Sequence, residues 1–352
     1  MSRINIVFIC ISAFVLVIQS EVNCISSGRT PQKYIVNLDI PAEKRWSHVV
    51  SEHRDFVLTV HKIMKSMVPK EIFPLVEFIA AEINNFIEQP YADEMKGIAK
   101  TLDCNVGDVV LATLIYDIAS YCTSIVTQDS YGQIWHARNL DYSFTDLLKN
   151  ITVEVDFQSN GKTQYSAVTF AGYVGIMTGQ RPHAFTVTVN ERDDGTLLWN
   201  ILIDLLDKNA VSVSLLIRNA LAYDHDFTSA VKRLSYTTTG AEAYIIVGGI
   251  KPGEGAVITK GHFKPDDVWM LNATDGQWFL VQTNYDHWKP PPPDDNRRSP
   301  ATRAMNSMGS SNITVESLFH VMSTRKVLNE QTVHTTVMSA GKPALMRTWI
   351  RR

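Results

Sequence analysis

The 352-residue chain has little of what several protein classes require. Its 33 Lys and Arg residues nearly balance 36 Asp and Glu residues, which leaves a net charge of −3 and no basic arm for nucleic acid. Charged residues make up 20% and hydrophobic residues 45%, a composition that excludes intrinsic disorder. HExxH, CxxC, Walker and GxGxxG motifs are absent. We therefore expect no metal ion, no cofactor and no nucleic-acid partner.

Long hydrophobic runs are equally scarce, and the one near the N-terminus spans Ile6–Ile18 with only Ser12 interrupting it. This 13-residue run follows Arg3 and ends in polar residues, the pattern of a secretory signal peptide, which we assign to residues 1–24. A membrane anchor is the alternative, but about 20 apolar residues are needed to cross a bilayer. No later segment approaches that length, so we expect no membrane-spanning helix in the mature protein.

Three sequons agree with passage through the secretory pathway. The N-x-[ST] motif occurs at Asn150, Asn272 and Asn312. One such motif can arise by chance, but three of them behind a signal peptide predict a glycosylated lumenal protein.

The hydrophobic pattern changes character near residue 121. From Trp46 to Ser120 it is helical, and Ile72–Ile87 places its apolar residues on one helix face with glutamates opposite. That helix either packs on the core or, because its face is broad and aromatic, contacts lipid. After residue 121, alternating segments and turn motifs predict paired strands around a block of helices, so the expected fold class is α+β.

A predicted hairpin brings chemistry to Cys122. If residues 129–132 form a four-residue loop, Cys122 lies opposite Asn139, and the return strand delivers Arg138 and Asp141 to the same strand end. The guanidinium would then favour a thiolate or hold a substrate oxygen.

Less functional interpretations of the same residues stay open. Free cysteines are among the most buried residues, so Cys122 could be a structural thiol. Arg138 and Asp141 could form a simple surface ion pair. A papain-like site would need a histidine base, and His136 is the histidine nearest in sequence.

Seven motifs spread over the chain carry a family resemblance: Cys122–Val126, Arg138–Tyr142, Gly172–Gly175 with Thr178–Gln180, Asn190–Asp193, Thr283–Pro290, Arg297–Arg298 and Thr336–Gly341. In order and spacing they resemble the family of N-acylethanolamine-hydrolysing acid amidase and acid ceramidase, from about residue 30 to the C-terminus. Within that family, Thr283–Pro290 is more similar to the acid amidase branch.

The resemblance implies an N-terminal nucleophile hydrolase, with an αββα sandwich and a mainly helical N-terminal α part. It also implies that the chain cuts its own Tyr121–Cys122 bond through an N-to-S acyl shift followed by hydrolysis. Residues 25–121 would then be the α part and residues 122–352 the catalytic β part of an α/β heterodimer. The freed α-amine would serve as the general base, which removes the need for a histidine.

Matching positions carry the family's catalytic roles onto this sequence. Cys122 would be nucleophile and base, Arg138 would position substrate and thiolate, and Asp141 would bind and orient the α-amine.

Three further positions match the family outside the hairpin. Glu191 resembles its acidic active-site residue and would assist proton transfer during self-cleavage. Asn284 would donate to the oxyanion, where one lost donor typically costs about 10²–10³ in rate. Arg297 resembles an arginine at the substrate entrance, although its neighbour Arg298 is a second candidate for that position.

The resemblance implies a lysosomal amidase that converts fatty acylethanolamides to fatty acid and ethanolamine through a thioester. Ceramide hydrolysis on the same scaffold is the closest alternative. Bile-salt or penicillin amide hydrolysis is another, but the nucleophile of those relatives follows a short leader. A lipid carrier without catalysis is the alternative from a different class, and the intact Cys, Arg, Asp and Asn set argues against it.

Histidine and cysteine counts complete the expectations. Protonation of all ten histidines would change the net charge from −3 to +7. At acid pH we therefore expect the protein to be cationic and to adhere to anionic lipid through its helical α part. Of the four cysteines, Cys10 leaves with the signal peptide and Cys24 lies at its edge. With Cys122 as nucleophile, Cys104 has no clear partner, and we expect a buried thiol there and no structural disulfide.

Overall fold

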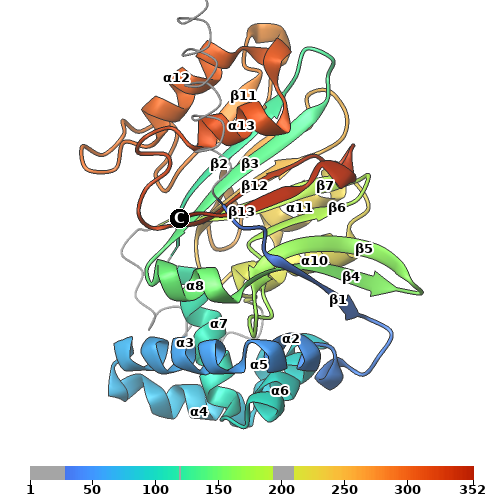
Figure 1. Cartoon of the computed structure of the whole chain (residues 1–352), viewed down its shortest axis with the longest axis vertical. Helices are drawn as coiled ribbons and strands as arrows, with labels where there is room; N and C mark the ends of the chain where they lie inside the picture. The colour runs from blue at the N-terminus through green and yellow to red at the C-terminus, as the bar shows by residue number, and fades with distance from the viewer. Residues whose placement is uncertain (1–27, 119, 193–209) are drawn as a thin grey trace, which may run out of the picture.

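Two β-sheets lie face to face between layers of helices in the computed structural model, which describes residues 28–118, 120–192 and 210–352 (Figure 1). The signal segment therefore lies outside the described residues. The larger sheet has eight strands, in the order β1 (Gln32–Asn37), β4 (Thr152–Ser159), β5 (Lys162–Phe170), β6 (Thr178–Arg181), β7 (Phe185–Glu191), β8 (Ala243–Gly248), β9 (Gly255–Lys260) and β10 (Pro265–Met270). The smaller sheet has five, in the order β11 (Phe279–Gln282), β2 (Ser120–Gln128), β3 (Ile134–Tyr142), β12 (Thr332–Met338) and β13 (Arg347–Ile350).

Helices cover the outer face of each sheet. The smaller sheet is covered by α12 (Arg298–Met308) and α13 (Val315–Met322). The larger sheet is covered by α10 (Val213–Tyr223), α11 (Phe227–Tyr236) and the N-terminal helices. These layers match the αββα sandwich that the family resemblance implied. The N-terminal helices are α2 (Ser47–Glu52), α3 (Arg54–Met67), α4 (Phe73–Ala81), α5 (Ile83–Phe86), α6 (Tyr91–Leu102) and α7 (Val106–Ile118), and α8 (Thr145–Ile151) follows the β2–β3 hairpin.

The strand β2 separates two hydrophobic clusters because successive side chains of a strand point to opposite faces. Val126 packs between the sheets, beside Ile246 and Leu280. Ile125 faces the other way and packs beneath α12 and α13, in a cluster with Leu318. The side chains of Cys122, Ser124 and Val126 therefore face the interior between the sheets.

The predicted single helix over residues 72–87 is two helices in the structure. A short 3-10 turn leads into α4, and Glu82, with φ −109° and ψ 29°, separates α4 from α5. Asn84 and Asn85 follow this break, and asparagine is a weak helix former. The predicted apolar face is confirmed, since Ile79 and Ile83 are both buried. Within the described residues, no helix has both the length and the hydropathy needed to span a bilayer.

The N-terminal part also contributes a strand to the larger sheet. Residues 32–37 of β1 pair in parallel with residues 153–158 of β4, so β1 forms one edge of that sheet. Along the chain, the hairpin from β4 to β5 turns at Asn160 and Gly161 with φ values of 49° and 70°, as the Asn-Gly motif predicts. The N-terminal part is thus joined to the rest by a sheet ladder as well as by packing.

A buried ion pair joins the same two parts deeper in the core. Arg218 of α10 donates to both carboxylate oxygens of Glu94 in α6, at 2.6 and 3.0 Å. Glu94 also accepts from Arg45 at 3.1 Å and from the indole N–H of Trp46 at 2.7 Å. Nearby, the Tyr91 hydroxyl donates to Asn219 at 2.6 Å. We call this set the inter-part cluster. Its Arg218–Glu94 and Tyr91–Asn219 contacts cross from the N-terminal part to the rest of the chain.

Candidate active site

The register of the β2–β3 hairpin differs from the prediction by one residue. Cys122 pairs with Leu140 rather than with Asn139, because the loop has five residues, 129–133. The carboxylate of Asp129 stabilises this longer loop by accepting the backbone N–H groups of residues 131 and 133, both at 2.9 Å.

This shift decides which side chains share a face, since one residue of register moves a side chain to the opposite side of the sheet. Arg138 lies on the Cys122 face, between the sheets, and Asp141 lies on the face covered by α12 and α13. Both side chains are fully buried. The alternative of a surface ion pair between them is therefore wrong.

The Cys122 thiol lies against the guanidinium of Arg138. Arg138 Nη2 donates to Cys122 Sγ at 2.7 Å and to the carbonyl of Val189 at 3.1 Å, and Nη1 donates to the carbonyl of Met177 at 2.6 Å. No carboxylate of the described residues forms an ion pair with Arg138, and its buried Nε has no partner there. A buried, uncompensated cation beside a thiol can stabilise a thiolate or a substrate oxygen.

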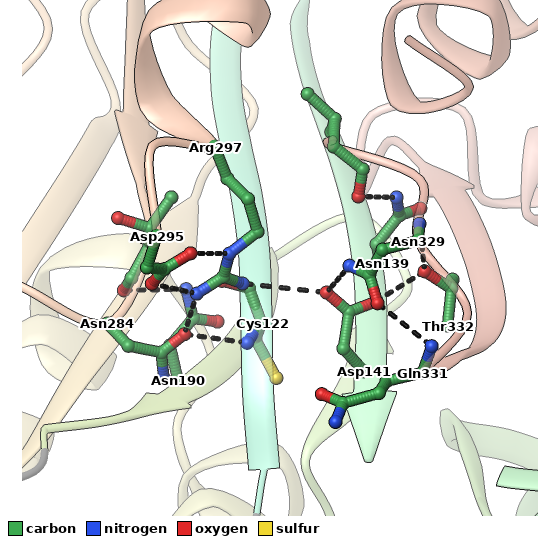
Figure 2. Close-up of polar contacts among 12 residues, drawn as sticks. Cys122, Asn139, Asp141, Asn190, Asn284, Asp295, Arg297, Asn329, Gln331 and Thr332 are labelled. Atoms are coloured by element: carbon green, nitrogen blue, oxygen red, sulfur yellow. Dashed lines mark hydrogen bonds and ion pairs between the residues drawn. The ribbon is translucent and has the colours of Figure 1, made fainter. Parts of the chain in front are cut away.

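Two side chains form hydrogen bonds with the Cys122 backbone where the pairing between β11 and β2 ends. The last pair between β11 and β2 joins Gln282 to Ser124, so no strand covers the next position. There Asn284 Oδ1 accepts the Cys122 backbone N–H at 2.7 Å, and Arg297 Nη1 donates to the Cys122 carbonyl at 2.8 Å (Figure 2). The nitrogen that would become the α-amine is therefore held by Asn284.

Arg297 connects these groups at the start of α12. It forms a bidentate pair with Asp295 at 2.6 and 2.7 Å, donates to Asn284 Oδ1 at 2.8 Å and lies 3.5 Å from Asp141 (Figure 2). Burial works against its charge, but the contacts with Asp295 and Asp141 outweigh burial and raise the pKa of Arg297. At 5% exposure it is an interior residue of the site, although it borders a cavity of about 260 Å³ that also reaches Tyr121.

Arg298 has a different place. It donates to the carbonyls of Asp286 and His287 at 3.2 and 3.1 Å, and its guanidinium lies 4.8 Å from the centre of the Tyr285 ring. The geometry therefore separates the two candidates, because only Arg297 contacts Cys122.

Asp141 is held by two side chains at and just before the start of β12. Its carboxylate accepts from the hydroxyl of Thr332 at 2.6 Å and from the amide of Asn329 at 2.9 Å (Figure 2). Burial raises the pKa of Asp141, while Arg297 and these two hydrogen bonds oppose that shift. Arg297 bonds to the Cys122 carbonyl and to Asp141, so it links the carboxylate to the nucleophile residue.

Glu191 enters the site through its backbone. Glu191 ends β7, and its carbonyl accepts from Asn284 Nδ2 at 2.8 Å. The amide oxygen of Asn284 faces Cys122 and its nitrogen faces Glu191, so donation to an oxyanion by Asn284 stays a prediction. The structure thus brings all six predicted residues, Cys122, Arg138, Asp141, Glu191, Asn284 and Arg297, into one connected group.

Three further residues contact this group and carry almost no signal in the sequence. Asn329 and Thr332 lie far along the chain in a polar loop, and only the fold brings them to Asp141. Asp295 lies shortly after four consecutive prolines, residues 290–293, and its position two residues before Arg297 is the one local hint of their pairing.

His136 is placed away from Cys122. It pairs with Val126, and its two ring nitrogens lie 3.0 Å from the hydroxyls of Thr186 and Thr188. Burial lowers the pKa of His136 to about 3, so the ring is neutral near pH 5. It belongs to a buried polar network and does not occupy the position of a base for the thiol.

Other residues singled out in the sequence have simple environments. Cys104 and Cys122 both carry free thiols, and burial raises the pKa of the half-buried Cys104 to about 11. Asn150, Asn272 and Asn312 are all exposed, as a glycan requires. Among the described residues, no group of three or more His, Cys, Asp or Glu side chains is arranged to hold a metal ion.

Comparison with known proteins places the chain in a family. A model described as linear amide C–N hydrolases of the choloylglycine hydrolase family matches residues 122–309, more than half of the chain. A second, described as the beta subunit of N-acylethanolamine-hydrolyzing acid amidase, matches residues 29–87.

Individual relatives extend over most of the chain. The mouse N-acylethanolamine-hydrolyzing acid amidase is 42% identical over 324 residues, which cover 92% of this chain and 89% of the mouse protein. Human acid ceramidase is 37% identical over 330 residues, covering 88% and 83% of the two chains. The solved Caenorhabditis elegans acid amidase ortholog is 44% identical with a TM-score of 0.61, over 66% of this chain and all of that one. The chain therefore belongs to the linear amide C–N hydrolases of the choloylglycine hydrolase family, in the group that contains N-acylethanolamine-hydrolysing acid amidase and acid ceramidase, and it is an amidase.

Proposed function

We propose that the protein hydrolyses N-acylethanolamines to fatty acid and ethanolamine, and that cleavage of its own Tyr121–Cys122 bond activates it. One observation carries the proposal: the amidase family match begins at Cys122, the residue whose thiol lies 2.7 Å from Arg138. The solved relative also matches over all of its length and 66% of this chain, the share that residues 122–352 make up.

Self-cleavage would begin at the thiol. Cys122 Sγ attacks the Tyr121 carbonyl carbon, the C–N bond breaks as the Cys122 nitrogen takes up the proton that the thiol loses, and the acyl group passes from nitrogen to sulfur. Water then hydrolyses the thioester, which leaves a carboxylate on Tyr121 and restores the thiol beside a new α-amine. Arg138 stabilises the sulfur anion, and Asn284 holds the departing nitrogen through the contact that it makes with Cys122.

Turnover would repeat this chemistry on a lipid amide. The α-amine removes the thiol proton, and the thiolate attacks the amide carbonyl of the substrate. The amine then returns the proton to the leaving ethanolamine nitrogen, so a thioester remains on Cys122. Water hydrolyses that thioester and releases the fatty acid. Asp141, acting through Arg297, keeps the Cys122 backbone in place for both half-reactions.

The relatives favour an acylethanolamide over a ceramide. Acid amidases of mouse and Caenorhabditis elegans are 42% and 39% identical to this chain, and human acid ceramidase is 37% identical. Rates of hydrolysis of a fatty acylethanolamide and a ceramide with the same acyl chain separate the two. We expect faster release of fatty acid from the acylethanolamide, and a preference for the ceramide would overturn this assignment.

The self-cleavage proposal has a matched pair of cysteine variants. Wild-type protein held in acid should split into two fragments, with the larger one beginning at Cys122 by N-terminal sequencing. Cys122→Ala should stay intact and inactive, and Cys104→Ala should split and remain active because Cys104 is a remote free thiol. A wild-type chain that never splits, or a Cys122→Ala chain that does, would refute the proposal. Activity in Cys122→Ala would also exclude a cysteine mechanism.

We propose that the enzyme works in the lysosome, reached as a glycoprotein through the secretory pathway. Support comes from the signal-like residues 1–24 and from the exposed sequons. Expressed in animal cells, the protein should lose mass on treatment with an N-glycosidase and sediment with lysosomal markers. A protein whose mass the glycosidase leaves unchanged would contradict the first point, and cytosolic recovery would contradict the second.

Three buried histidines make the protein less positively charged in acid than the histidine count alone implies. His61, His136 and His334 are buried, and burial lowers their pKa values, to about 4 for His61 and about 3 for His136. With these three neutral, the remaining seven histidines change the formal charge from −3 to at most +4, not +7.

The membrane contact is proposed on the N-terminal helices, where Phe56 of α3 and Phe78 of α4 are 46% and 50% exposed. At pH 5 the protein should bind vesicles that contain anionic lipid more tightly than neutral vesicles. Phe78→Ser should weaken binding, and Phe263→Ser, which removes a still more exposed ring outside these helices, should not. Binding that ignores anionic lipid, or an equal loss in both variants, would contradict the proposal.

A further inference from the structure

A second group of charged residues lies directly behind the candidate site. At its centre is Asp286, which is only 4% exposed. One carboxylate oxygen accepts from the Tyr244 hydroxyl at 2.8 Å and from Arg192 Nε at 3.2 Å, and the other lies 2.8 Å from Lys289 Nζ. Burial acts against the charge of Asp286, but the hydrogen bonds from Lys289 and Tyr244 lower its pKa overall. We call Arg192, Tyr244, Asp286 and Arg298 the backing cluster.

The backing cluster is built from the same chain segments as the site. Arg192 directly follows Glu191, and Asp286 lies two residues after Asn284. Two contacts therefore join the end of β7 to the segment after β11: Asn284 Nδ2 to the Glu191 carbonyl at 2.8 Å, and Arg192 to the Asp286 carboxylate at 3.2 Å. The first contact holds Asn284, whose amide faces Cys122. The second contact is made by the neighbouring residues Arg192 and Asp286, which lie farther from Cys122.

The third site segment is tied in at the same point. Arg298 directly follows Arg297 and donates to the backbone carbonyl of Asp286 at 3.2 Å. The segments that carry Glu191, Asn284 and Arg297 thus meet at Asp286. Asn284 itself accepts from both Cys122 N and Arg297, so its position depends on where these segments are held.

We propose that Asp286 is a positioning residue of the amidase, whose carboxylate acts through Arg192 to hold the Asn284 amide against the nitrogen of Cys122, while Arg298 binds its backbone carbonyl. The inference rests on the proposed function, because it gives Asn284 a role at that nitrogen. Displacement of about 1 Å at a reacting centre can cost 10²-fold in rate. Loss of the Asp286 charge should therefore slow both self-cleavage and turnover without removing any group that touches substrate.

The test compares two aspartates that share one arginine. Asp266 also pairs with Arg192, but its side chain is 46% exposed and it lies on the edge strand β10. We expect Asp286→Asn to lower kcat by about 10²-fold with little change in KM, and to slow self-cleavage by a similar factor. Asp266→Asn should stay within about twofold of wild type in both. Equal effects of the two variants would overturn the proposal.

A double-mutant cycle shows whether Asp286 acts through Asn284. If it does, Asp286→Asn should lower kcat in the wild-type background and have almost no further effect in Asn284→Ala, since coupled residues are not additive. Fully additive losses, or an Asn284→Ala variant with wild-type kcat, would overturn the proposal. The proposed function fails on a different result, namely activity in Cys122→Ala.

A milder variant covers the case in which Asp286→Asn does not fold. Tyr244→Phe removes one hydrogen bond to Asp286 and changes no charge. It should lower kcat by a few-fold at unchanged KM, with the same non-additivity towards Asn284→Ala. Wild-type kcat in a folded Tyr244→Phe protein would overturn the role of the backing cluster.

Discussion

Two buried arginines of this protein differ in how their charges are compensated. Arg218 forms a bidentate pair with Glu94, at 2.6 and 3.0 Å, and lies 4.7 Å from the ring centres of both Tyr91 and Phe157. Arg138 is as deeply buried but donates to carbonyl oxygens, a hydroxyl and the sulfur of Cys122.

The difference separates a structural charge from a reactive one. A buried charge destabilises a protein unless it is paired, so each unpaired one needs an explanation. Arg218 has its carboxylate and joins the N-terminal part to the rest of the chain. Arg138 has no such partner among the described residues, and the anion that would complete it is the thiolate of Cys122 or a substrate oxygen.

Breaking the inter-part cluster should have the largest effect on stability. Glu94→Gln leaves the buried Arg218 and the partly buried Arg45 without their carboxylate, and we expect a loss of about 3–5 kcal/mol in the free energy of unfolding. Asp108→Asn is the control, because its pair with Lys65 is partly exposed and its loss should cost at most about 1 kcal/mol. Denaturant unfolding measures both, and similar losses would mean that burial of the Glu94 pair is unimportant.

Replacing Arg138 should have the opposite effect, with a large loss of activity and a smaller loss of stability. Arg138→Met should lower kcat/KM by about 10²–10³ or more, the scale of one lost electrostatic contact in an active site. Its unfolding free energy should fall by less than that of Glu94→Gln, since the charge that it removes has no carboxylate partner. Kinetic assays and denaturant unfolding of both variants test the contrast. The contrast would be wrong if Arg138→Met were less stable than Glu94→Gln or kept its activity.

The pH dependence of stability should reflect His136, which lies in the same interior as Arg138. Its pKa is about 3 in the folded protein, below the ordinary 6.5, so the folded state binds fewer protons than the unfolded state. This contribution is present above pH 6.5 and is lost as the pH falls towards 3, at about 1.4 kcal/mol per pH unit. In His136→Gln, unfolding free energies measured from pH 7 to pH 4.5 should fall less steeply than in wild type. An unchanged slope would show that His136 does not contribute.

The smallest effect is expected from one hydroxyl of the inter-part cluster. Tyr91→Phe removes the 2.6 Å hydrogen bond to Asn219 and keeps the ring beside Arg218. We expect a loss of about 1 kcal/mol in thermal or denaturant unfolding and unchanged kcat/KM. A marked loss of activity would mean that the inter-part cluster influences the active site and is not only structural.

Much of the fold follows from local sequence. The change from helical to alternating pattern falls close to the end of α7 and the start of β2. The Asn160-Gly161 turn forms where it is predicted because both residues accept positive φ at low cost. Family motifs were enough to select six residues that the structure brings together, because their order along the chain is preserved.

The details that failed depend on contacts that a pattern does not contain. The hairpin register depends on Asp129, whose side chain stabilises a five-residue loop. The break at Glu82 falls inside an uninterrupted apolar period. Asp295 and Asn329 anchor Arg297 and Asp141 from segments that carry no recognisable motif, so only the three-dimensional arrangement reveals them.

The edge strand β1 has a consequence for how such a protein can be made. Residues 122–352 by themselves would leave six positions of β4 with an open row of N–H and C=O groups, a template on which another copy could add a strand. Because the N-terminal segment is synthesised first, it is already present when β4 emerges and can cap that edge at once. Synthesis as a single chain therefore guards against aggregation. Two separately translated chains would be protected only after they had met and paired.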